Sequence, residues 1–228
     1  YVRWENQGLA LLEYQLATIG PAINRTIRVL SAGTASVSKM PAAILRDSSV
    51  QVVEMFNTNP VPDFNNFDLV LFPRDGNWDA WPFMSWMDPM SAYVKKGGAA
   101  MFSGAYNYDL PDVLALMKGG HSFYNHTAGH VQTLQADRPP EVFEGVATPL
   151  PYQAEQFAMS FGTGAAFHSW VQSSAGGSLA GYESLGQGKS GFIGYDFQQS
   201  SPTSRRLLLN MVRWLTNRSL PFWLKAPT

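Results

Sequence analysis

Polar residues that could do chemistry stand in three short stretches of this 228-residue chain. In the first stretch, Asp75, Asn77 and Trp78 lie close together in a sequence that also contains proline and glycine. Carboxylates and amides hydrogen-bond to hydroxyl groups, and an indole ring can stack on a sugar ring. The stretch therefore indicates either sugar or polyol binding, or a loop held by its own Asp and Asn turns.

The second stretch holds three histidines, His121, His126 and His130, within ten residues. Imidazoles bind zinc and other divalent ions, and Glu155 could act as a fourth ligand or as a base. The spacing matches no standard metal motif, and glycines at 119, 120 and 129 are typical of an exposed loop. Solvent-exposed or hydrogen-bonded histidines are therefore favoured over a metal site, and we expect no cofactor.

The third stretch runs from Ser103 to Tyr106, directly after a short apolar segment. A nucleophilic serine needs a G-x-S-x-G turn with a histidine and an acid beside it, and the first glycine is absent here. A tyrosine phenol, with an ordinary pKa of about 10, is a poor nucleophile at neutral pH. We expect Ser103 to end a strand, and both residues to line a ligand site rather than to react.

The composition argues against several kinds of function. The chain has no cysteine, which excludes disulfides, thiolate catalysis and cysteine-ligated metals. Its 16 basic and 17 acidic residues form no long run of either sign, so nucleic-acid binding is unsupported. No apolar run approaches the roughly 20 residues of a membrane-spanning helix. Three Asn-x-Ser/Thr sequons are a faint hint of an extracytoplasmic location: Asn24, Asn125 and Asn217.

The apolar pattern predicts the elements that must position these residues. Four short runs are almost continuously apolar and are separated by helix-like or polar segments; they begin near Ile27, Val50, Phe67 and Ala99. Such runs are typical of parallel strands whose sheet is covered on both faces. We therefore predict a flavodoxin-like, doubly wound α/β fold with a mainly parallel sheet.

The pattern changes after the fourth run. Residues 121–170 contain short β-type pieces broken by proline and glycine, which predicts a small antiparallel extension of the sheet. Residues 179–183 and 191–195 then predict a hairpin around a glycine-rich turn. The sequence of this turn is similar to that of a phosphate loop, but a strand follows it instead of a helix, so we expect a plain turn.

An amphipathic helix is predicted near each end of the chain, over residues 6–19 and 204–216. The second should bury an apolar face made of Leu208, Met211, Val212 and Leu215. Its three arginines should reach solvent: Arg205, Arg206 and Arg213. We expect a helical segment over residues 1–26 and one domain over 27–228.

Three motifs occur in a fixed order along residues 27–216. The first is a helix end and two glycines before an apolar strand, at 93–102; the second is the segment 131–139 with the later Glu155; the third is the glycine-rich hairpin at 186–197 with its closing helix. In this order they resemble the class I glutamine amidotransferase-like superfamily, and within it the ThuA-like (trehalose utilization) proteins. The resemblance implies the same α/β fold.

The chain departs from that family where the family's chemistry resides. The cysteine of the amidotransferase elbow is replaced by Ala105 or Tyr106, and the histidine of a His-Pro pair appears as Arg138. The family's Cys–His–Glu triad cannot be carried over, so we expect no glutaminase or other cysteine-nucleophile activity.

Two functions then compete. One is a non-catalytic binding or assembly module, which could form part of a larger protein. The other is a ThuA-like carbohydrate-active enzyme that uses acid/base or metal chemistry through Glu155, His126 and Asp75. The expected partner is a carbohydrate or another protein subunit, and no nucleic acid.

Overall fold

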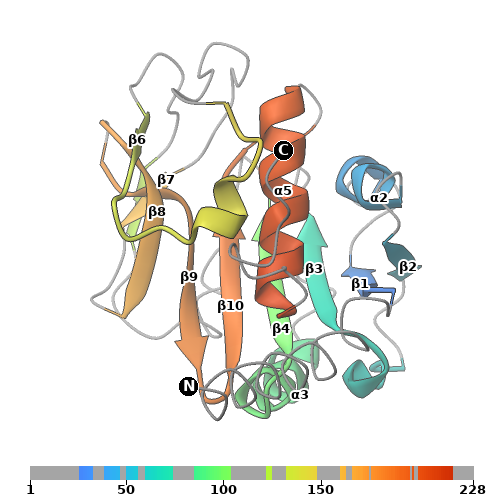
Figure 1. Cartoon of the computed structure of the whole chain (residues 1–228). Helices are drawn as coiled ribbons and strands as arrows, with labels where there is room; N and C mark the ends of the chain where they lie inside the picture. The colour runs from blue at the N-terminus through green and yellow to red at the C-terminus, as the bar shows by residue number, and fades with distance from the viewer. Residues whose placement is uncertain are drawn as a thin grey trace, which may run out of the picture.

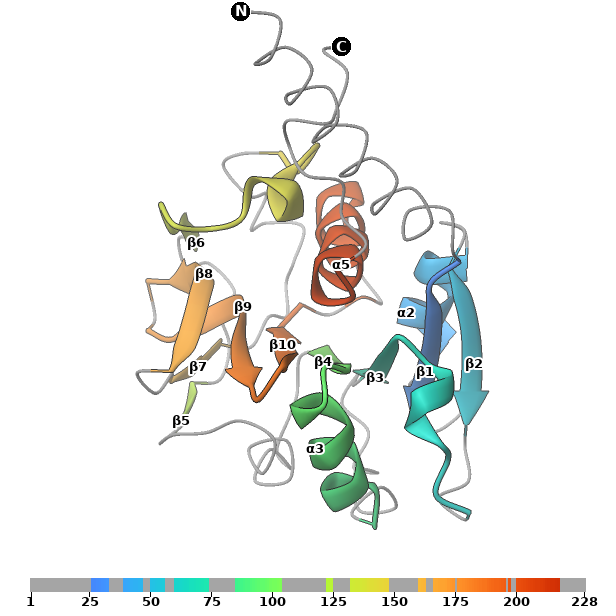
Figure 2. The same cartoon turned by 60° about the horizontal axis from the view of Figure 1, so that its bottom comes forward.

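A single sheet with helices on both faces dominates the computed structural model of this chain (Figures 1 and 2). The structure describes residues 26–32, 39–46, 50–55, 60–73, 85–103, 122–124, 132–147, 160–162, 166–174, 176–195, 197 and 200–217. The predicted helix at 6–19 lies outside these ranges, and the predicted boundary at residue 26 lies at the start of the first range.

Five parallel strands form one half of the sheet. They are β1 (Arg28–Ala32), β2 (Gln51–Met55), β3 (Leu69–Pro73), β4 (Ala99–Ser103) and β10 (Gly188–Ile193). Their order in space is β2-β1-β3-β4-β10, and each neighbouring pair is parallel. All residues of β3 and β4 are buried, as expected of central strands covered on both faces. The predicted doubly wound sheet is confirmed.

Five antiparallel strands continue the sheet beyond β10. They are β5 (Ser122–Tyr124), β6 (Gln132–Leu134), β7 (Ser160–Gly162), β8 (Phe167–Ser173) and β9 (Ser178–Leu185). Strand β9 pairs with β10 and then with both β7 and β8, which pair in turn with β5 and β6. The predicted antiparallel extension is therefore confirmed.

The hairpin between β9 and β10 has a turn of only two residues, because Leu185 lies opposite Gly188. The first turn residue, Gly186, has a φ of 63°, which favours glycine. The N–H of the second, Gln187, donates to the carbonyl oxygen of Lys95 at 3.0 Å. The turn is shorter than the sequence predicted, and it packs against the end of helix α3 (Met87–Lys95).

Helix α5 (Pro202–Leu215) covers one face of the sheet together with α2 (Lys39–Arg46) (Figure 2). The Oγ of Ser201 caps α5 by accepting a hydrogen bond from the N–H of Ser204 at 3.1 Å. The predicted apolar face is confirmed, since all four of its residues are buried in one core cluster: Leu208, Met211, Val212 and Leu215.

One arginine of α5 differs from the prediction. Arg205 and Arg206 are exposed as expected, but Arg213 is half-buried. Burial, with a smaller contribution from the nearby Arg206, lowers the pKa of Arg213. The contact surface of α5 therefore reaches further round the helix than its apolar stripe indicates.

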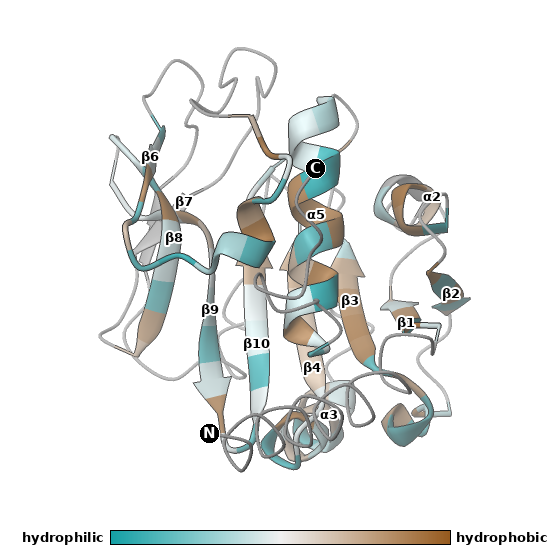
Figure 3. Ribbon diagram, viewed as in Figure 1, coloured by the Kyte–Doolittle hydropathy of each residue, from teal (hydrophilic) through white to brown (hydrophobic). Residues whose placement is uncertain are grey.

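Helix α3 covers the other face (Figure 2). Its Met90, Tyr93 and Val94 pack in a second core cluster with residues of the parallel strands, among them Val70 and Phe102. Figure 3 shows that apolar colouring is strongest along β3, in the middle of the parallel half. None of the described helices is long and apolar enough to cross a membrane.

Candidate functional site

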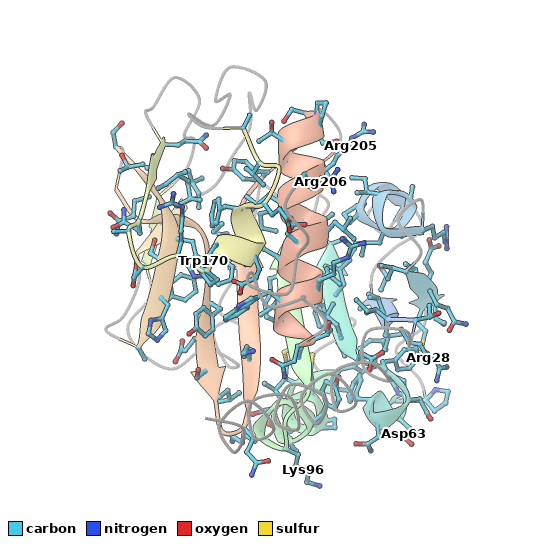
Figure 4. The ribbon with its side chains drawn as sticks, in the orientation of Figure 1. Arg28, Asp63, Lys96, Trp170, Arg205 and Arg206 are labelled. Atoms are coloured by element: carbon cyan, nitrogen blue, oxygen red, sulfur yellow. The ribbon has the colours of Figure 1, made fainter. Side chains whose placement is uncertain are left out.

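The carboxyl edge of the parallel strands is where open α/β sheets bind their ligands. The chain passes from β1 to β2 on one side and returns to β3 on the other, so the winding reverses at β1 and β3. In Figure 1 the arrow of β3 points to the end of the sheet where α5 begins, and Figure 4 places Arg205 and Arg206 there. We take this edge as the candidate site.

Ser103 ends β4 at this edge and is buried, with 1% of its surface exposed. It lies between Pro73 of β3 and Ile193 of β10 in the strand register. Its Oγ has no hydrogen-bond partner among the described residues, so no base in the described part of the chain is bonded to it. The prediction that Ser103 ends a strand is confirmed, and the geometry gives no sign of an activated nucleophile.

The other predicted site residues lie outside the described part of the chain. These are Asp75, Asn77, Trp78, Tyr106, His121, His126, His130 and Glu155. Their roles in ligand binding, acid/base chemistry and metal binding stay predictions. Within the described ranges, no group of three or more histidine or acidic side chains could hold a metal ion.

A buried polar pair that the sequence did not indicate lies at the same edge. The hydroxyl of Tyr195, just after β10, donates to Oε1 of Gln132 at 2.7 Å. Tyr195 is 2% exposed and Gln132 8% exposed, and Nε2 of Gln132 has no hydrogen-bond partner among the described residues. Tyr195 could have been found from its place after the last apolar strand. Gln132 belongs to the segment 131–139, but nothing in that segment indicates a partner 63 residues away.

Arg138 stands where the resemblance expects a histidine. Its Nη1 donates to the carbonyl oxygen of Gln135 at 2.6 Å, and its guanidinium lies 5.4 Å from the centre of the Phe143 ring. Both contacts hold the turn between β6 and the 3-10 helix η3 (Pro140–Phe143). A guanidinium stays protonated and cannot act as a base, so this position supplies none.

The glycine-rich segment at 186–190 forms a hairpin, as predicted, and not a phosphate loop. Its Lys189 lies 4.2 Å from the centre of the Trp214 ring, and its Nζ donates to Oδ1 of Asn217 at 2.6 Å. Burial lowers the pKa of Lys189. This lysine is held within the fold at the end of the sheet opposite the candidate site.

Comparison with known proteins supports the fold. No family model matches the chain, and no curated protein sequence matches it. Among solved structures, a ThuA-like protein from Parabacteroides merdae has a TM-score of 0.58 and 13% identity, over 89% of this chain and 94% of that one. A glutamine amidotransferase from Thermotoga maritima has a TM-score of 0.52 and 10% identity, over 86% and 95%.

A third similar structure belongs to a much longer protein. The cold-adapted β-galactosidase from Rahnella sp. R3 has a TM-score of 0.52 and 12% identity, and the match covers 91% of this chain but 34% of that one. At such identities the similarity shows the fold alone. The chain therefore has the glutamine amidotransferase-like fold that its motifs indicated, with ThuA-like proteins among its structural neighbours.

Proposed function

We propose that this chain is a non-catalytic domain of amidotransferase-like fold that acts as a binding or assembly module. The observation that carries the proposal is the absence of cysteine from the whole sequence. The resemblance expects a cysteine nucleophile just after the fourth strand, where this chain reads Gly104-Ala105-Tyr106.

Two structural observations support the proposal. The hydroxyl of Ser103 has no base bonded to it among the described residues, and Arg138 is engaged in holding a turn. In the Rahnella β-galactosidase, a region similar to this chain makes up about a third of a longer enzyme. A fold that occurs as one part of a larger protein is suited to a supporting or binding role.

The second candidate function is a carbohydrate-active enzyme. It is favoured by the similarity to the ThuA-like structure, since the match covers 94% of that protein and 89% of this chain. Its chemistry would depend on Glu155, His126 and Asp75, acting as acid, base or metal ligands.

Assays of the purified chain separate the two candidates. We expect no hydrolysis of glutamine, of p-nitrophenyl acetate or of p-nitrophenyl glycosides. Ala105→Cys should also give no glutaminase activity, because Arg138 stands in place of the partner histidine. Turnover by the unmodified protein that is abolished by Tyr106→Phe or Glu155→Gln, but not by the control Asp88→Asn on the exposed side of α3, would overturn the proposal.

A further inference from the structure

We propose that the Ser103 hydroxyl and the Gln132 carboxamide contact the ligand of this module, and that the ligand is uncharged and presents hydroxyl or carbonyl oxygens. This inference rests on the proposed function, since it assumes that the carboxyl edge binds rather than reacts.

The strand register places Ser103 and Tyr195 at one edge and on one face of the sheet, and a hydrogen bond joins Gln132 to Tyr195. Met101 belongs to the core cluster of the α5 face, so Ser103, two residues further along β4, points to that face too. Ile193 lies opposite Ser103, and Tyr195, on the same face, follows it by two residues. With strands about 4.8 Å apart and a rise of about 3.3 Å per residue, the Cα atoms of Ser103 and Tyr195 are roughly 8 Å apart. The Gln132 side chain is bonded to Tyr195.

The free atoms define what the ligand must offer. Since Oε1 of Gln132 accepts from Tyr195, the amide atom left over is the donor Nε2. The hydroxyl of Ser103 can donate or accept. Native proteins leave few buried polar groups without partners, and those that remain call for an explanation. An oxygen on a bound molecule would satisfy both groups.

The surroundings favour an uncharged molecule. The residues that share the cluster of Tyr195 are apolar, among them Trp170, Val142 and Ile193. A charged group placed there would lose its hydration without a counter-charge in that cluster, because the buried Glu183 lies opposite Ser190 on the α3 face. The exposed Arg205 is bonded to Oγ of Ser200 at 2.8 Å, but it and Arg206 could attract an anion to the rim. The test must therefore distinguish an anionic ligand from an uncharged one.

The test measures binding by thermal shift and calorimetry on the full chain. The uncharged probes are xylitol, myo-inositol, glucose and N-acetylglucosamine, and the charged matches are gluconate and glucose 6-phosphate. We expect at least one uncharged probe to raise the Tm and the charged matches to have no effect. Ser103→Ala and Gln132→Met should each weaken that binding by about tenfold or more, because each removes a hydrogen bond in a buried site.

Ser190→Ala is the matched control. Its hydroxyl is also buried and also lacks a partner among the described residues, but Ser190 lies within β10 opposite Ala100, on the α3 face. It should bind like the unmodified protein. Binding of charged probes only, binding unaffected in both site variants, or no binding by any probe would each overturn the inference. The second of these outcomes would leave the module function in place, whereas turnover of a probe would overturn the module function itself.

Discussion

The two ends of the parallel sheet treat their polar side chains differently. At the amino end of β10, Lys189 has both an aromatic ring and the Asn217 amide as partners. In the same part of the molecule the Tyr93 hydroxyl donates to the carbonyl oxygen of Phe67 at 3.0 Å. Figure 4 shows Lys96 at this end and Arg205 at the other.

At the carboxyl end, Ser103 Oγ and Gln132 Nε2 are buried without partners among the described residues. A polar group buried in this way lowers the stability of the fold. Sequences break such local rules mainly where function requires it. The hairpin end therefore bonds its lysine and its tyrosine within the fold, with Ser190 Oγ of β10 as an exception, while the carboxyl end keeps two groups that are costly to stability. Four predictions test this contrast, from the largest expected effect to the smallest.

The largest effect concerns α5, which supports the sheet beneath both ends. Leu208 is completely buried in the core cluster of that face. Leu208→Ala should lower the free energy of unfolding by roughly 2–4 kcal/mol, the usual range for a buried large-to-small change. Urea unfolding measures it. A loss below about 0.5 kcal/mol, typical of a surface position, would show that α5 is peripheral.

The second prediction concerns Tyr93 and alkaline pH. Burial, more than the nearby Asp68, raises the pKa of Tyr93 from 10.0 to about 12. Tyr93 therefore loses its proton at a lower pH in the unfolded chain than in the folded protein. The protonated hydroxyl contributes its full stability below pH 10, and this contribution is lost as the pH rises from 10 to about 12. At pH 8, Tyr93→Phe should be less stable than the unmodified protein by about 1 kcal/mol, for the lost hydrogen bond.

The stability difference between Tyr93→Phe and the unmodified protein should then shrink above pH 10 and reverse before pH 12 is reached. Urea unfolding of both proteins across this range measures it. Tyr182→Phe is the comparison variant, since burial raises the pKa of this half-buried tyrosine as well. A constant difference between the Tyr93 variant and the unmodified protein would contradict the prediction.

The third prediction concerns Lys189 at the hairpin end. Lys189→Met removes the cation–π contact and the bond to Asn217, and should cost about 1 kcal/mol in unfolding free energy. Lys96→Met is the control, because Lys96 is exposed just after α3. It should change stability by less than about 0.5 kcal/mol. Equal effects of the two substitutions would mean that the partners of Lys189 do not stabilise the fold.

The smallest effect is expected at the carboxyl end. Ser103→Ala should change the unfolding free energy by less than about 0.5 kcal/mol or raise it, because no bond to another described residue is lost. Ser178 is the contrast: it is equally buried, and its hydroxyl donates to the carbonyl oxygen of Ala180 at 3.0 Å. Ser178→Ala should cost about 1 kcal/mol. Ser178 starts β9 at the same end of the sheet, so the two variants compare a bonded with an unbonded hydroxyl. If Ser103→Ala were as costly as Ser178→Ala, the account of Ser103 as a group without a partner would fail.

Much of the fold was predictable because short local sequence patterns indicate its strands. Apolar runs at Ile27, Val50, Phe67 and Ala99 lead into or form the four strands, and the parallel sheet follows from their spacing along the chain. The half-burial of Arg213 was not predictable, because it depends on the surface against which α5 packs.

The candidate site was predictable only in part. Ser103 was found because it directly follows an apolar run. The Gln132–Tyr195 pair was missed because the tertiary fold joins two residues that are 63 positions apart, and neither of the motifs that contain them indicates the other. Glutamine side chains are mostly exposed in proteins, so a glutamine in a short strand is expected at the surface unless a buried partner is known.

The most direct test of a binding site without a nucleophile is the mass of the intact protein. The unmodified chain is incubated with glutamine or p-nitrophenyl butyrate, quenched in acid and measured by mass spectrometry, with an unfolded sample as the control for non-specific acylation. The account predicts no adduct specific to the folded protein. A single acyl adduct that forms only on the folded chain and maps to Ser103 or Tyr106 would contradict it.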